Sequence, residues 1–147
     1  QSEISMVPPD YSINMKTRQI KNKISLNEYV HLIDYRVSSI DEHKHEMKLL
    51  FKVVEVIPKD WRIFLHGQVQ PEHVSSLPEV RQKHGFDNWD FYPKIKTSGW
   101  QKGSYILVSR RFRANPARYL IETGFYSSDG RESEMAKLGW HDLPSSL

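Results

Sequence analysis

Residues 46–69 read EMKLLFKVVEVIPKDWRIFLHGQV, and this stretch decides the fold class. In its first half every second residue is apolar, namely Met47, Leu49, Phe51 and Val53, and lysines occur among the residues between them. Alternation with a period of two is typical of a β-strand that has one face in a core. We therefore expect a half-buried strand here.

The second half of the same stretch predicts a turn and a second strand. Pro58 fixes its own φ and Asp60 can bond to its own backbone, so Ile57–Asp60 is expected to turn. We expect Gly67 to form a β-bulge. The face of this second strand that enters the core is predicted to hold Trp61, Ile63, Leu65 and Val69.

Four further segments read as strands or hairpins. They are an alternating strand over 29–37, a strand over 104–112, a hairpin over 117–136 that turns at 128–130, and a short strand at 138–140. Two half-buried sheets bury their apolar faces most simply against each other. The sequence thus predicts an all-β fold, an antiparallel immunoglobulin-like β-sandwich of about seven strands over residues 24–147, with one long inter-strand loop at 70–103. Residues 1–23 are expected to form an extended N-terminal arm.

Composition excludes several classes of protein. The 147 residues suit a single domain, and 21 basic against 18 acidic residues are too evenly balanced for a nucleic-acid-binding surface. No apolar run approaches the ~18 residues of a membrane span. Without cysteine there is no thiolate zinc site. A chain that begins at Gln1 is expected to be a processed product, through loss of a signal peptide, or a fragment.

The segment 85–100, GFDNWDFYPKIKTSGW, is the candidate ligand site, since its aromatic residues follow neither a helical nor a strand period. Aromatic rings stack on sugar faces, and carboxylate and amide oxygens accept hydrogen bonds from hydroxyls. The alternative is that Trp100 and Phe91 close one end of the sandwich while an aspartate caps a turn. The predicted ligand-binding residues are Trp89, Tyr92, Trp100, Asp87, Asn88 and Asp90.

Motifs for catalysis and for metal binding are missing from the sequence. It has no nucleophile elbow, no phosphate-cradling glycine loop and no zincin helix, so we predict a protein that is not an enzyme and has no cofactor. A hydrolase that uses Asp87 and Asp90 is a minor alternative. His43 and His45, with His66 or His73, lack the context of a metal site, and no metal is predicted.

A basic run, Arg110–Arg113, lies in the strand predicted at 104–112. Arg111 and Arg113 share one face of that strand and are predicted to contact an acidic partner or anionic lipid headgroups. The alternative is that the charges protect a sheet edge from unwanted pairing, which we favour for Arg110.

Four stretches carry a resemblance to a known family: ISLNEYVHLIDYRV (24–37), MKLLFKVVEVIPKDWRIFLHGQV (47–69), DFYPKIKTSGWQKGSYI (90–106) and ARYLIETGFYSSDGRE (117–132). Together they resemble the extracytoplasmic C-terminal β-sandwich domain of polytopic membrane glycosyltransferases of the protein-mannosyltransferase type. The resemblance implies a non-catalytic module outside the cytoplasm, in the periplasm or at a membrane surface. This chain lacks the membrane-spanning part, and its loop at 71–90 is longer, so transferase activity is not implied.

The expected function is therefore that of a non-enzymatic accessory or binding module, for a glycan or for an integral-membrane protein partner. The alternative is a structural subunit of a larger cell-envelope assembly with no small ligand. In that case the arm and the arginine edge would dock onto neighbouring subunits.

Overall fold

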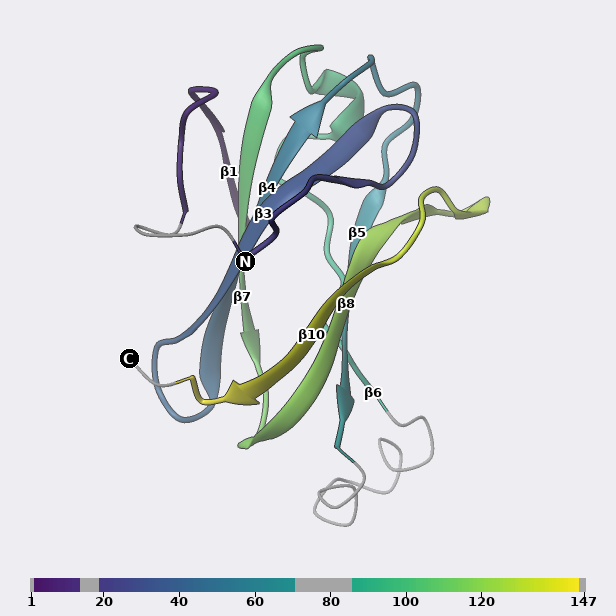
Figure 1. The fold of residues 1–147 in the computed structure, drawn as a ribbon. Helices are drawn as coiled ribbons and strands as arrows, with labels where there is room; N and C mark the ends of the chain where they lie inside the picture. Colours follow the sequence, from purple (N-terminus) through teal and green to yellow (C-terminus); the bar gives the residue numbers. More distant parts are fainter. Residues whose placement is uncertain (1, 14–18, 71–85, 146–147) are drawn as a thin grey trace.

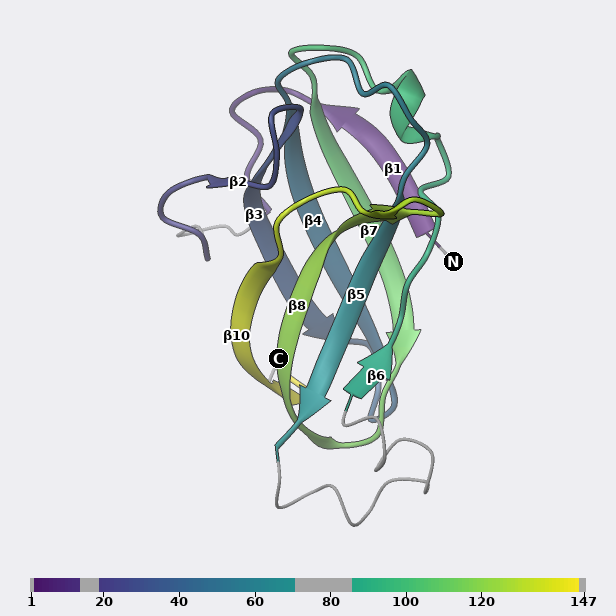
Figure 2. The ribbon, with the colours of Figure 1, turned by 90° about the vertical axis from the view of Figure 1, so that its right-hand side faces the viewer.

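The computed structural model describes residues 2–13, 19–70 and 86–145. These residues form two antiparallel sheets that pack face to face, which confirms the predicted β-sandwich (Figures 1 and 2). Over the described ranges no helix is long and apolar enough to cross a bilayer. The sequence of residues 75–85, SSLPEVRQKHG, also predicts a short helical turn capped by Ser76, and these residues lie outside the described ones.

The first sheet contains the N-terminal strand and the centre of the chain. Its strands, in spatial order, are β1 (Ser2–Val7), β7 (Tyr105–Arg113), β4 (Lys44–Val53), β3 (Val30–Ser39) and β2 (Ile24–Ser25).

The second sheet carries the candidate site. Its order is β10 (Ala136–Leu143), β8 (Ala117–Ser127), β5 (Arg62–Val69) and β6 (Phe86–Asn88), and β9 (Gly130–Arg131) also pairs with β8. A short 3-10 helix, η2 (Thr97–Gly99), precedes β7. The described residues thus form more strands than the seven expected, because β2, β6 and β9 have only two or three residues and show no period of their own.

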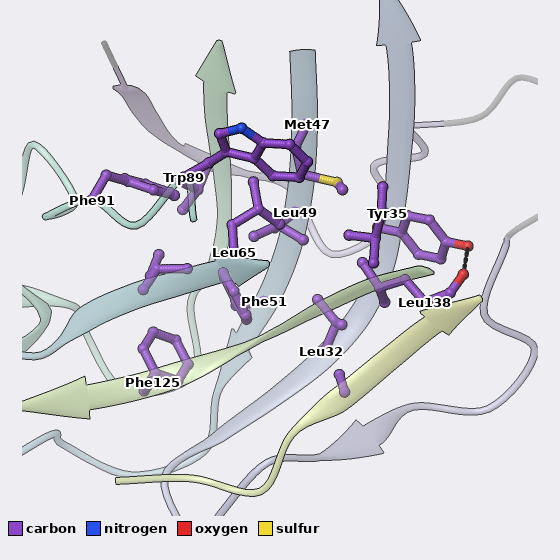
Figure 3. Close-up of a cluster of buried hydrophobic side chains, with 14 of the residues drawn as sticks. Leu32, Tyr35, Met47, Leu49, Phe51, Leu65, Trp89, Phe91, Phe125 and Leu138 are labelled. Atoms are coloured by element: carbon purple, nitrogen blue, oxygen red, sulfur yellow. Dashed lines mark hydrogen bonds between the residues drawn. The ribbon is translucent and has the colours of Figure 1, made fainter. Parts of the chain in front are cut away.

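The core lies between the facing sheets (Figure 3). Every residue predicted for the inner face of β4 is buried, as are Trp61, Ile63, Leu65 and Val69 of the following segment. Tyr35 Oη donates a 2.7 Å hydrogen bond to the carbonyl oxygen of Leu138, which joins β3 to β10 across the sandwich. Each fully buried large apolar side chain contributes about 1.5–3 kcal/mol.

The β-bulges differ from the prediction. β5 pairs with β8 in unbroken register through Gly67, so the bulge expected there is wrong. Instead the register shifts in β3 between Leu32 and Asp34, which breaks the strict alternation expected over 29–37. The side chains of Ile33 and Asp34 both lie on the outer face of the first sheet. Ile33 packs with Ile13 and Leu50, and Asp34 accepts a hydrogen bond from the Gln19 N–H at 2.9 Å.

The N-terminal arm is integrated into the first sheet. β1 pairs with β7 from Ser2 opposite Arg110 to Val7 opposite Tyr105. Further along, Ile13 is buried in the small cluster on the outer face of the sheet. The arm therefore provides an edge strand and an apolar cover within the same chain.

Candidate functional site

The segment 86–92 runs extended alongside β5 beyond the end of β6. The N–H of Trp89 donates to the carbonyl of Leu65 at 2.8 Å, and Ile63 and Phe91 exchange hydrogen bonds of 2.9 and 3.0 Å. The segment therefore has the period-two alternation of a strand. The prediction that residues 85–100 have no strand period is therefore wrong for 86–92, whereas 93–100 form no strand.

The odd-numbered residues of this segment face the core. Asp87 is buried opposite Gly67, and the Trp89 side chain is only 7% exposed. The centre of the Trp89 ring lies 4.3 Å from that of the Phe112 ring, and Nε1 of Trp89 donates to the carbonyl of Arg113 at 2.9 Å. Trp89 thus offers no free face on which a sugar could stack.

Trp100 is a core residue too. It is 3% exposed, its ring lies 5.8 Å from that of Phe51, and Nε1 donates to the Ile95 carbonyl at 3.0 Å. Its position agrees with the alternative in which Trp100 and Phe91 pack against the sandwich. Phe91 is also buried.

The even-numbered residues, Asn88, Asp90 and Tyr92, lie on the outer side of the second sheet. Asn88 is exposed, Asp90 is half-buried and Tyr92 is 60% exposed. The structure therefore brings these three predicted residues to one surface and separates them from Asp87, Trp89 and Trp100. Neighbouring strands add outward residues that are not among the predicted ligand-binding residues: Arg62, Phe64 and His66 of β5, and Tyr126 of β8.

A cavity of about 320 Å³ opens on this surface. Its wall is completed by the turn after β8. The residues that line it are Phe64, His66, Asn88, Asp90, Tyr126, Gly130, Arg131 and Met135. The Phe64 ring lies across Gly124, where a Cβ atom would stand 2.6 Å from the ring carbons. The cavity thus has an aromatic floor that depends on a glycine in the adjacent strand.

Asp90 is the polar centre of this cavity. Its Oδ1 lies 3.1 Å from His66 Nε2 and accepts the Leu65 N–H at 2.9 Å, and its own N–H donates to Asn88 Oδ1 at 2.9 Å. Burial alone raises the pKa of Asp90, but the hydrogen bonds from His66 and Leu65 outweigh burial and hold the pKa below its usual value. The carboxylate is therefore ionised at neutral pH.

Arg62 joins the cavity to Tyr92. Its Nη1 donates to the Tyr126 hydroxyl at 3.1 Å, and the guanidinium carbon lies 4.7 Å from the centre of the Tyr92 ring and 5.4 Å from that of Tyr126. Burial, together with the hydrogen bond and charge of Asp90, raises the pKa of the Tyr126 hydroxyl. The hydroxyl is therefore neutral and can still donate a hydrogen bond.

The geometry bears on the hydrolase and metal alternatives. Asp87 and Asp90 face opposite sides of the sheet, so they do not flank one cleft as a glycosidase pair would. Among the described residues no group of three side chains could hold a metal ion. His45 is buried, with Nδ1 2.8 Å from Ser39 Oγ and Nε2 3.1 Å from the Ala114 carbonyl. His73 lies outside the described residues.

The arginine run divides between the two faces of β7. Arg111 and Arg113 are both exposed, on the outer face, and Arg111 Nε lies 3.7 Å from Glu46 Oε2. The side chain of Arg110 lies on the inward-facing side of β7, and its guanidinium carbon lies 5.2 Å from the centre of the Phe91 ring. The distribution of these side chains matches the alternation expected for this strand.

No protein-family model, curated protein or solved structure matches the chain. Inferences about function therefore depend on the geometry of the sites.

Proposed function

We propose that this chain is a non-enzymatic β-sandwich module that binds a carbohydrate in the outer cavity over β5, β6 and β8. The observation that carries the proposal is the cavity itself, where an aromatic floor meets converging hydrogen-bonding groups. Its volume of about 320 Å³ lies at the lower end of the range for small-molecule sites. A location outside the cytoplasm, as an accessory module, is proposed from the resemblance over residues 24–132.

The chemistry of the cavity suits a sugar ring, which has an apolar C–H face and a rim of hydroxyls. The half-buried Tyr126 provides aromatic surface for the apolar face, and Phe64, which is 5% exposed, adds only a small part of the lining beneath it. The ionised Asp90 and the Asn88 amide provide acceptors, and Arg131 provides donors for ring or hydroxyl oxygens. Tyr92, exposed and held beside Arg62, extends the aromatic surface beyond the cavity.

The electrostatics support binding rather than acid catalysis. A general acid must carry a proton at the working pH, whereas the hydrogen bonds of Asp90 keep its pKa low. A hydrogen bond from a sugar hydroxyl to a charged acceptor is also stronger than one to a neutral acceptor. We expect dissociation constants of roughly micromolar to millimolar, since few polar contacts are available.

The test is a screen of immobilised glycans, followed by titration of the best binder by NMR with wild type and Asp90→Asn. The variant keeps an oxygen for the Leu65 N–H but loses the charge, so we expect affinity to fall about tenfold. Asp142→Asn, at an exposed position on β10, is the matched control and should bind as wild type does. Equal affinity in all three proteins, or no glycan bound at millimolar concentration, would contradict the proposal.

A second candidate function, docking to an acidic membrane protein, is favoured by the outer face of the first sheet. Near the end of β7, side chains of β3, β4 and β7 point outward and are exposed or half-exposed. Glu46 is the one acid among them. The basic residues around it are Arg36, Lys44, Lys48, Arg111 and Arg113. Purification from the native envelope in mild detergent should then recover a stoichiometric companion. Arg111→Glu with Arg113→Glu should release that companion, whereas Arg118→Glu on β8 should not.

A further inference from the structure

A second and larger cavity, of about 850 Å³, lies on the first sheet where β4 ends and β3 and β7 begin. The register places His31 opposite Lys52, and Lys52 opposite Tyr105, so three strands contribute neighbouring side chains to its floor. The loop before β2 and the turn before β7 form its rim. The basic residues that line it are Lys21, Lys23, His31, Lys52 and Lys102.

These positive charges have little local compensation. Lys102 pairs with Glu55 at 3.1 Å, at a solvent-exposed position. Across the ranges the structure describes, Lys21, Lys23 and Lys52 form no ion pair. Lys52 Nζ lies 5.3 Å from the centre of the Tyr105 ring, which positions its side chain beside the cavity. Gathering like charges in one concave site is unfavourable unless a counter-charge is present.

The same positive charges affect the pKa of His31. Burial is the largest cause of its lowered pKa, and the charges of Lys23 and Lys52 lower the pKa further. An imidazole that lines the cavity therefore stays neutral near pH 7, where Nδ1 or Nε2 can donate one hydrogen bond.

The remaining walls are apolar or made of backbone. Ile33, turned outward by the bulge in β3, lines the cavity together with Tyr105, whereas the side chain of Val53 is fully buried on the inner face. Gly103 has a φ of 84° and donates its N–H to the Val53 carbonyl at 2.7 Å. This left-handed residue makes the tight turn that holds Lys102 at the rim.

We infer that this cavity binds an organic phosphate, with the phosphate group among the lysines and the organic part against the apolar wall. Lysine ammonium groups bind phosphate as point charges with several donors, and a dianion matches two or more of them. The cavity has room for more than the phosphate alone, so a phosphate ester fits better than the inorganic ion. Such a group occurs on soluble metabolites and on lipid headgroups.

This inference is independent of the proposed sugar site. The lysine cavity lies on the outer face of the first sheet, and the sugar cavity lies on the outer face of the second. Failure of one therefore does not imply failure of the other.

The experiment compares two double variants that remove the same charge from the protein. Lys23→Gln with Lys52→Gln changes the cavity, and Lys94→Gln with Lys137→Gln, at exposed positions outside the cavity, is the matched control. Glucose 6-phosphate and inorganic phosphate are titrated by NMR at constant ionic strength. Phosphatidylcholine vesicles with and without phosphatidic acid are tested by co-sedimentation.

We expect wild type and the control to bind a phosphate ester and the cavity variant to bind it about tenfold more weakly for each lysine lost. Stronger binding to the phosphatidic acid vesicles identifies a lipid source, and stronger binding to glucose 6-phosphate identifies a soluble one. Equal weakening in both double variants would reveal only a general charge effect and overturn the inference. Absence of binding to every probe would overturn it as well.

Discussion

Gly124 occupies the place on β8 where the Phe64 ring crosses from β5. A methyl group there would meet the ring at 2.6 Å and the Glu134 carbonyl oxygen at 3.0 Å, so either the ring or the strand must move. Since the ring lines the sugar cavity, the absence of one side chain in β8 affects the shape of a site to which β5, β6, β8 and β9 all contribute residues.

For Gly124→Ala we expect the free energy of unfolding to fall by about 1–3 kcal/mol and glycan binding to weaken, because overpacking displaces Phe64. Urea denaturation and the glycan titration measure the two effects. Gly99→Ala is the control, as its Cβ would make only an ordinary 3.7 Å contact with Ile95. Similar stability losses in both variants would show that the contact with Phe64 is not the cause.

His45 provides a pH-dependent contribution to stability. Burial lowers its pKa from the ordinary 6.5, and Nε2 must carry the proton because it faces the Ala114 carbonyl, which leaves Nδ1 as an acceptor for Ser39. As the pH falls below about 6.5 the unfolded histidine binds a proton before the folded one does. Stability is therefore fully present above this pH and declines below it, by up to about 1.4 kcal/mol per pH unit.

The measurement is urea denaturation of wild type and His45→Gln from about pH 7.5 to about pH 5. This range spans the ordinary pKa of histidine. The variant should show a smaller slope of stability against pH. His31, whose pKa is also lowered, contributes a slope of the same sign in both proteins and cancels in the comparison. An unchanged slope would mean that His45 has the same pKa in the folded and the unfolded protein and so adds nothing to the pH dependence.

At the scale of the element, the segment 86–92 shows why the sequence predicted only half of the site. Its strand period is hidden because Asp87, a charged residue, is buried while Tyr92, an aromatic one, is exposed. Residue type alone therefore assigned Trp89 to the ligand and could not separate it from Tyr92. The outward row of β5, which holds Arg62, Phe64 and His66, follows from the inward row that the sequence predicted. The sequence did not show that this row lies beside β6 and β8.

Trp89→Ala tests the position of this segment. We expect a loss of about 3–5 kcal/mol, because the substitution empties a buried site between Phe112 and Tyr119 and removes the hydrogen bond to the Arg113 carbonyl. Thermal and urea unfolding measure the loss. Trp140→Ala on β10, where the side chain is 43% exposed, should cost much less. Unchanged stability together with lost glycan binding would instead restore Trp89 as a ligand contact.

At the scale of the whole molecule, the sandwich could be predicted because its long strands carry clear apolar rows, such as Met47 to Val53. The two-residue and three-residue strands could not, since pairing over so short a length leaves no pattern in the sequence. The integration of the arm was also hidden, because Met6 is 61% exposed and Ile4 only half-buried, which makes β1 a weakly amphipathic strand.

Deletion of residues 1–7 tests the role of β1. The deletion leaves β7 without its partner from Tyr105 to Arg110 and exposes backbone groups on a long edge strand. We expect lower stability and concentration-dependent association, measured by light scattering. Met6→Ser, which changes an exposed side chain but keeps the strand, should remain as monodisperse as the wild type. A monodisperse truncated protein would show that the charges of β7 are enough to protect its edge.

The pairing of Ser2 with Arg110 also affects the order in which the chain can fold. β1 leaves the ribosome before β7 and has no partner until residues 105–110 have followed it, whereas β3 and β4 pair across a short turn. Folds with such distant pairings typically form in milliseconds to seconds, more slowly than helical bundles of equal stability. In newly made chains β1 would therefore stay unpaired for longest, and that period is when a chaperone or a second chain would compete with β7 for it.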